Sequence, residues 1–320
     1  MTTMLDRMRT LRHFDYNPAL SESKVRGWLD VICRKAAPFV IDNVTEYVFA
    51  TSSKADWDTD DYPCLTPPFP LVWLETKRPS CINHGPSLLR SGRKQISSDH
   101  MPEHWGLGFQ SERLPDKGWQ VSAMLVLEQR KGEFTVPGYF LFMTLDEQGL
   151  IKEYDPTFTL PEGFDEQQAA DNTGIMTIWS RPALLALSFC HCKNVRTAEV
   201  TPPPKLSKAH ERRHKKPLVR YHTLEIDPMR EILRREGGSD KVGLQQALHI
   251  CRGHFKDYRE SGLFGRNKGL YWWDQHLRGQ AQEGTVLKDY RVVGQKARRI
   301  GEHVTDVSGP TKSREEFLGT

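Results

Sequence analysis

The segment Leu248–Gly279 combines histidine, cationic and aromatic side chains at a density that indicates chemistry on a polyanion. It contains three histidines and six Arg or Lys residues. Cationic side chains are almost never fully buried unless they are paired, so this mixture is poorly suited to a hydrophobic core. It suits a surface that attracts phosphates by charge and stacks aromatic rings on bases.

Two histidines of this segment, His254 and His276, have the side chains that metal-free RNA cleavage needs. Such cleavage requires a general base and a general acid, and an imidazole can be either near neutral pH. Arg252 and Arg278 would hold the phosphate and offset the negative charge that develops on it. Each histidine lies two positions from one of these arginines, so in a strand each pair shares a face. If their strands are adjacent, the four residues predict the site of a toxin-like, metal-independent endoribonuclease.

The same segment predicts a nucleic-acid-binding surface. Its aromatic side chains suit splayed bases better than a closed duplex groove, so RNA is favoured over duplex DNA. The three consecutive aromatics at 271–273 alternate between strand faces, so at most some of them stack on bases. For any single histidine, packing beneath an indole ring is the structural alternative. The predicted binding residues are Lys256, Tyr258, Arg259, Arg266, Lys268, Tyr271, Trp272 and Trp273.

A second group of candidate residues would cut nucleic acid with a metal ion. Asp60 and Asp61 precede the apolar segment 69–74, which is followed by Glu75 and, two positions on, Lys77. An acidic residue, a gap and then E-x-K after a strand is the pattern of PD-(D/E)xK nucleases, in which the carboxylate ligates Mg²⁺. The tripeptide is common, so an ordinary strand end is the alternative.

The remaining cysteines and histidines predict neither a metal nor a cofactor. Cys190 and Cys192 flank His191, but no second Cys/His pair follows at zinc-finger spacing, and packing explains two small thiols better. The sequence has no phosphate-binding glycine loop and no dinucleotide fingerprint. We therefore expect no cofactor.

The charge is distributed unevenly along the chain. The net charge of +4 at pH 7 arises from a basic part, residues 205–320, with 24 Lys and Arg against 15 Asp and Glu, and an acidic remainder. A basic half indicates an anionic partner, although a surface kept basic for solubility is the alternative. The chain has no apolar run long enough for a membrane helix and its start lacks a secretory apolar core, so we expect a cytoplasmic protein.

The order of predicted elements indicates an α+β protein in two parts. Residues 1–200 are expected to form an acidic α+β domain with an antiparallel sheet, and could dock a partner or restrain the basic part. The Pro-rich and cationic stretch 201–217 predicts a linker. Residues 218–303 predict a smaller basic helix-and-sheet module that binds nucleic acid, followed by a flexible tail, 304–320.

The hydrophobic pattern predicts individual elements within these parts. Residues 244–258 fit either a helix or a strand, because Gly253 weakens the helix prediction. Helices are expected over 21–40, 182–190 and 229–235, and strands over 69–74, 119–129, 138–145, 174–180, 218–226, 270–278 and 285–293.

The C-terminal half resembles a group of bacterial proteins found with prophages and other mobile elements. The resemblance covers about residues 185–293 and implies no catalytic assignment. It favours a role in conflict between phage and host, where ribonucleases, nucleic-acid binders and inhibitors all occur. The matching residues are Ser188-Phe189, His191–Asn194, Pro217–Tyr221, Arg252–Phe255, Tyr258, Leu263–Gly265, Tyr271–Trp273, His276, Arg278-Gly279 and Asp289-Tyr290.

Three classes of function remain open from the sequence. The first is a nucleic-acid-binding protein of a mobile element, in its sharpest form an endoribonuclease. The second is a non-enzymatic partner-binding, structural or inhibitor protein, and the third is a metal-dependent nuclease centred on Glu75 and Lys77.

Overall fold

A computed structural model describes most of the chain. The described residues are 2–11, 14–51, 62–80, 90–91, 94–95, 101–160, 163, 165–235, 247–251, 253–274, 276–278 and 280–285. The predicted strand over 285–293 lies almost entirely outside these residues, and the predicted tail lies wholly outside them. No helix among the described residues is long and apolar enough to cross a membrane.

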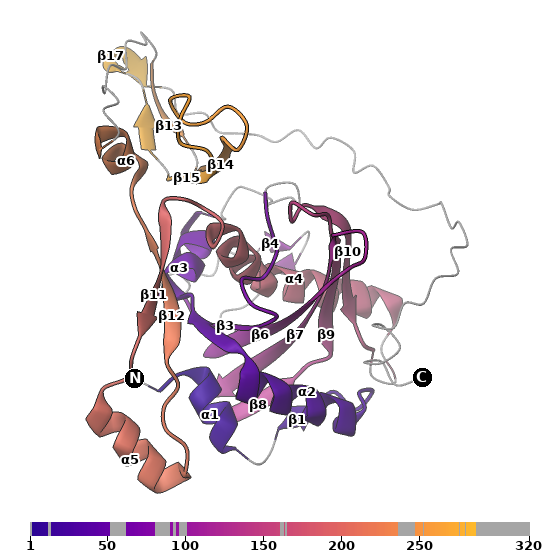
Figure 1. Cartoon of the computed structure of the whole chain (residues 1–320). Helices are drawn as coiled ribbons and strands as arrows, with labels where there is room; N and C mark the ends of the chain where they lie inside the picture. Colours follow the sequence, from indigo (N-terminus) through magenta and orange to yellow (C-terminus); the bar gives the residue numbers. More distant parts are fainter. Residues whose placement is uncertain are drawn as a thin grey trace.

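A ten-stranded, mostly antiparallel sheet forms the centre of the molecule (Figure 1). Its path runs β1-β8-β7-β6-β3-β2-β12-β11, and β9 pairs with β7 and β10. Only the β1–β8, β2–β3 and β2–β12 pairs are parallel. The strands are β1 (Asp15–Tyr16), β2 (Ala37–Val40), β3 (Leu71–Lys77), β6 (His104–Arg113), β7 (Trp119–Arg130), β8 (Glu133–Val136), β9 (Tyr139–Leu145), β10 (Ile151–Phe158), β11 (Val195–Val200) and β12 (Tyr221–Ile226).

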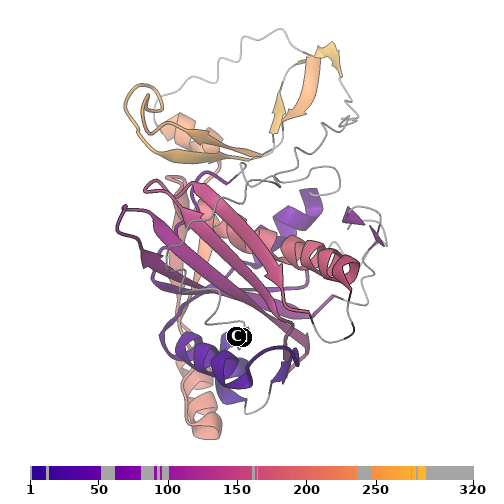
Figure 2. The same ribbon diagram turned by 90° about the vertical axis from the view of Figure 1, so that its right-hand side faces the viewer.

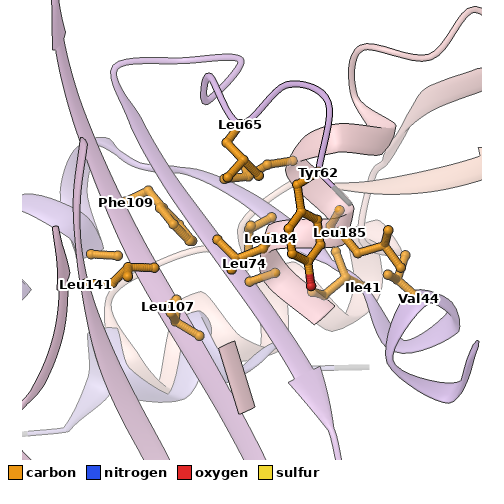
Figure 3. Packing of buried hydrophobic residues seen from close by; sticks show 14 of the residues in the cluster. Ile41, Val44, Tyr62, Leu65, Leu74, Leu107, Phe109, Leu141, Leu184 and Leu185 are labelled. Carbon is orange, nitrogen blue, oxygen red and sulfur yellow. The ribbon is translucent and has the colours of Figure 1, made fainter. Parts of the chain in front are cut away.

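Helices cover both faces of this sheet (Figures 1 and 2). On one face, α3 (Asp42–Thr51) and α4 (Glu166–Phe189) pack on residues such as Leu74 and Leu107, as Figure 3 shows. On the other, α1 (Met4–Thr10) and α2 (Glu22–Lys35) pack on Trp73 and its neighbours. Because both faces are buried, the central strands are apolar at successive positions rather than alternating.

Two glycines of β6 bring indole rings against the sheet. A Cβ at Gly106 would lie 2.3 Å from the Trp73 ring, and one at Gly108 would lie 2.2 Å from the Trp28 ring. Real Cβ atoms do not approach other atoms this closely, so only glycine allows these rings to lie so near the strand. The packing of α2 against the sheet therefore depends on Gly108, whereas Gly106 accommodates the Trp73 ring of β3.

Helix α1 is held on the sheet by two buried carboxylates. Glu75 accepts hydrogen bonds from the backbone N–H groups of Met4 (2.6 Å) and Leu5 (2.8 Å) at the start of the helix. Glu128 forms a bidentate ion pair with Arg7. Burial would raise the pKa of Glu128, but hydrogen bonds from His104, Arg7 and a backbone amide lower it to about 2.

Helix α4 corrects one prediction. Residues 174–180, expected as a strand, form the middle of a single 24-residue helix together with the predicted helix 182–190. The helix starts with a capping box between Asp165 and Gln168, and it continues through Pro182. The β-branched residues in 174–180 favoured a strand locally, but burial of this segment against the sheet determines its conformation.

The expected linker contains a helix, and the sheet continues beyond it. Residues 204–214 form α5, and the strands on either side of it, β11 and β12, pair antiparallel over their whole lengths. Strand β12 also pairs with β2, so it is the continuation of the central sheet.

The structure confirms the α+β class. The C-terminal part contains α6 (Met229–Arg235) and small sheets formed by β13 (Ala247–Cys251), β14 (His254–Asp257), β15 (Leu270–Trp273), β16 (His276–Arg278) and β17 (Gln280–Thr285). A two-stranded hairpin, β4 (Arg90–Ser91) and β5 (Lys94–Gln95), lies elsewhere.

Candidate nucleic-acid interface

The β14–β15 hairpin contains most of the residues expected to bind nucleic acid, and one of its faces packs on the body of the protein. Trp272 has 1% of its surface exposed and forms edge-on contacts with Phe189 at the end of α4 and with Tyr47 of α3. Asn194 fixes the hairpin further, because its side chain bonds both the N–H (2.9 Å) and the C=O (2.8 Å) of Trp272. A Cβ at Gly253 would lie 2.3 Å from the Tyr47 hydroxyl, so this close approach also requires glycine.

Burial removes two predicted stacking residues from the surface. Trp272 belongs to the main core, and Tyr271 is 5% exposed and packs with Met229 and Leu263. Neither ring has a free face for a base. Both side chains instead attach the hairpin to the rest of the molecule.

The outer face of the hairpin presents the remaining predicted residues. His254 is exposed and pairs across the strands with Trp273, and the Lys256 ammonium lies 4.1 Å from the centre of the Trp273 ring. Arg259 is paired with Asp257 at 2.6 Å, which reduces its attraction for a phosphate. Tyr258 is half-buried against the Tyr271 ring, and Arg266 and Lys268 are exposed in the connecting loop.

Only one of the four predicted catalytic side chains, that of His254, lies in the described part of the chain. Arg252 lies outside the described residues, and of His276 and Arg278 only the backbone is described. Strand β16 pairs with β13, where Cys251 faces His276, whereas His254 pairs with Trp273 of β15.

A cationic surface lies on α5, which the sequence analysis treated as a linker. The helix has no buried residue. Four cations on one side of this helix are exposed: Lys205, Lys208, Arg212 and the C-terminal cap residue, Lys215. Their spacing of three, four and three positions places them within one arc of the helix surface. No ion pair involves them in the described part of the chain.

Helix α5 extends away from the body at the end of the β11–β12 ladder, opposite the β14–β15 hairpin (Figures 1 and 2). Its base is fixed by the next residues, because Lys216 Nζ donates to the Arg9 carbonyl at 2.7 Å and Leu218 N donates to Ser207 Oγ at 3.2 Å. Residues 204–216 contain six Lys and Arg and one acidic residue, Glu211.

The sequence signal for α5 was its charge rather than any hydrophobic period. A helix without an apolar stripe gives no periodic hydrophobic pattern. The available signals for a helix were Pro204 at its first turn and the spacing of the charges, and the sequence analysis used neither.

The geometry around Glu75 and Lys77 is that of a structural element. The Glu75 carboxylate accepts three hydrogen bonds, two from the start of α1 and one from the Trp73 indole at 2.7 Å. Lys77 is half-exposed and lies 3.5 Å from Asp42. Asp60 and Asp61 lie outside the described residues. The carboxylate that would ligate Mg²⁺ is therefore already used to hold α1.

A pair that the sequence analysis did not identify joins Cys64 to His191. Burial opposes ionisation of the Cys64 thiol, but its interaction with His191 outweighs burial and lowers the pKa of the thiol. Burial likewise disfavours a charged imidazole, yet Cys64 raises the pKa of His191. The second ring nitrogen lies 2.7 Å from the Thr66 carbonyl oxygen, which orients the ring. The contact therefore favours the charged forms of both Cys64 and His191 relative to what burial alone would give.

The neighbouring thiols differ from Cys64. Burial raises the pKa of Cys190 to about 12 and also raises that of Cys192, so both are neutral packing groups. Within the described residues, no group of three His, Cys, Asp or Glu side chains is placed to hold a metal ion. Comparison of the chain with protein-family models, with curated proteins and with solved structures found no match.

Proposed function

We propose that this protein binds nucleic acid through α5. The observation that carries the proposal is the stripe of four exposed cations, Lys205, Lys208, Arg212 and Lys215, on a helix that extends from the body. Over ten residues at about 1.5 Å each the stripe spans about 15 Å. That is the axial length of about four phosphates along one strand of a duplex.

The surplus of positive charge on α5 favours a polyanionic partner over a purely solubilising surface. Lys208 and Arg212 are four residues apart, and like charges at this spacing destabilise a helix. In the described part of the chain neither cation has an acidic partner, although Glu211 lies between them. A row of phosphates would relieve this repulsion, and it would release counter-ions on binding.

The outer face of the β14–β15 hairpin would be a second contact. Lys256 and the half-buried ring of Trp273 offer one cation and one aromatic side chain, which suits an unpaired base better than a duplex. RNA is the favoured target for that reason. Cleavage has no support in the described geometry, and the endoribonuclease stays a prediction of the sequence.

Two variants with the same change of charge test which surface binds. The α5-neutral variant carries Lys205→Gln, Lys208→Gln and Arg212→Gln. The hairpin-neutral variant carries Lys256→Gln, Arg266→Gln and Lys268→Gln. Glutamine is close to lysine and arginine in helix propensity, so the α5-neutral helix should persist.

The assay is fluorescence anisotropy with a labelled 20-nucleotide single-stranded RNA and a duplex of the same length. We expect the α5-neutral variant to bind at least about tenfold more weakly than the wild type at low salt. Wild-type affinity of this variant for both nucleic acids would contradict the proposal. In parallel, RNA cleavage that survives EDTA and is lost in His254→Ala would support the endoribonuclease.

A further inference from the structure

A cavity of about 540 Å³ lies between α1, α2 and the residue that follows the α5 cap. Its apolar lining includes Met8, Phe14, Leu29 and Cys33. Burial raises the pKa of the Cys33 thiol to about 11, so this thiol is neutral at pH 7 and adds an uncharged surface. Pockets of this volume hold small organic ligands.

Cations surround this apolar lining. Arg9, Arg34 and Lys216 line the cavity and all three act electrostatically on the Cys33 thiol, together with one acid, Asp30. Asp30 is paired with Arg34 at 2.8 Å. The cavity therefore has a surplus of positive charge on the side of Arg9 and Lys216.

Backbone contacts position both of these cations, and in the described part of the chain only Arg9 also has an acidic partner. Lys216 Nζ donates to the Arg9 carbonyl at 2.7 Å, and the Arg9 guanidinium donates to the Pro217 carbonyl at 3.1 Å. The nearest carboxylate to Arg9, that of Asp6, lies 3.9 Å away and also accepts from the Val219 amide. The Arg9 charge is thus shared with Asp6, whereas Lys216 has no acidic partner among the described residues, so the pair keeps a surplus of positive charge for an anionic group in the cavity.

We propose that this cavity binds a nucleoside phosphate. The phosphate lies at Arg9 and Lys216, and the base lies on the apolar lining beside Phe14 and Tyr16, which supply aromatic surface. Such a nucleotide is either free or an unpaired nucleotide of a strand bound on α5. The second source rests on the proposed function, because Lys216 directly follows the α5 cap residue and a strand on α5 would reach the cavity there. Binding of a free nucleotide does not depend on the proposed function.

Gly27 offers a way to fill the cavity without disturbing the fold. It lines the cavity from α2, and a Cβ at this position meets no atom within 4 Å. Gly27→Leu introduces a bulky side chain, and Gly27→Ala is the matched control that has the same backbone effect but leaves space. Both substitutions should stabilise α2, because glycine is unfavourable inside a helix.

The test is isothermal titration calorimetry of the full-length chain with adenosine 5′-monophosphate, uridine 5′-monophosphate and inorganic phosphate. We expect both nucleotides to bind the wild type and Gly27→Ala alike, and to bind Gly27→Leu and Lys216→Gln at least about tenfold more weakly. Inorganic phosphate should bind at least about tenfold more weakly than either nucleotide. No nucleotide binding by the wild type, or undiminished binding by Gly27→Leu, would overturn the proposal.

Two further titrations distinguish a free nucleotide from one supplied by a bound strand. They also test the cavity proposal and the α5 proposal independently. If a strand supplies the nucleotide, Gly27→Leu should also weaken binding of a 5′-phosphorylated RNA pentanucleotide. The α5-neutral variant should keep wild-type affinity for the mononucleotides. Mononucleotide binding without any effect of the α5 charges on RNA binding would uphold the cavity and refute the proposed function. Weaker RNA binding by the α5-neutral variant, without mononucleotide binding by the wild type, would refute the cavity proposal alone.

Discussion

Glu75→Gln distinguishes the structural role of this carboxylate from a role in metal-dependent cleavage. Glu75 is 5% exposed and accepts three N–H groups, those of Met4, Leu5 and the Trp73 indole. An amide has a single acceptor oxygen. At the position of Oε2 it can still serve Leu5 and Trp73, but the Met4 amide then faces an NH2 group.

The expected cost follows from these contacts. A buried donor without an acceptor costs about 1–3 kcal/mol. Burial raises the pKa of Glu75 to about 7, so the carboxylate is only partly ionised at pH 7. Loss of that partial negative charge at the N-terminus of α1 therefore adds less than about 1 kcal/mol. An amide is cheaper to bury than a carboxylate, which offsets part of this sum. We therefore expect Glu75→Gln to lower the free energy of unfolding by about 2 kcal/mol.

The assay is urea denaturation at pH 7, with Lys77→Met as the control. Lys77 is half-exposed and its pair with Asp42 is 3.5 Å long, so its loss should cost less than about 1 kcal/mol. A PD-(D/E)xK nuclease predicts a different pair of results, in which both variants stay stable and lose Mg²⁺-dependent cleavage. That outcome would refute our interpretation of Glu75 as the anchor of α1.

Three further predictions test other parts of the structure. Trp272→Ala should cost about 3–5 kcal/mol in urea denaturation because it leaves a cavity in the core, whereas Trp273→Ala should cost clearly less; equal costs would contradict the assigned faces of the hairpin. Cys64 should react with iodoacetamide faster than the other described thiols at pH 7, and its rate should decrease as the pH is lowered. The substitution His191→Asn should slow the reaction, as followed by mass spectrometry, and an unchanged rate in that variant would refute the pair. Glu128→Gln should cost about 3 kcal/mol at pH 7, since the pKa of Glu128 falls from 4.5 in the unfolded chain to about 2 in the folded protein. This contribution is present above the unfolded pKa and is lost as pH falls towards 2, so a difference between wild type and variant that persists there would contradict it.

The central strands could be predicted from sequence because their apolar runs are long. The runs 119–129 and 138–145 correspond to β7 and β9, whose neighbours in the sheet and covering helices bury both faces. Helix α4 could not be predicted as one element, since its middle contains β-branched residues that favour strands locally. The capping box at Asp165 was the available signal for its start.

The candidate site was predicted less well than the sheet, because it depends on which side chains meet. The aromatics at 271–273 were predicted to alternate between strand faces. In the structure Trp272 is buried, whereas Trp273 is half-buried at the surface. Which face packs on the body depends on Phe189 and Tyr47, which are remote in sequence. The contact between Cys64 and His191 likewise joins residues of two distant segments, and no local pattern reports such a contact.

The salt dependence of RNA binding tests the central claim most directly. Each phosphate neutralised on a single strand contributes about −0.7 to the slope of log K against log [salt]. The α5-neutral variant removes three cations, so its slope should be shallower than that of the wild type by about 2. The hairpin-neutral variant should change the slope by less. A slope that stays at the wild-type value in the α5-neutral variant would contradict the claim that α5 holds nucleic acid.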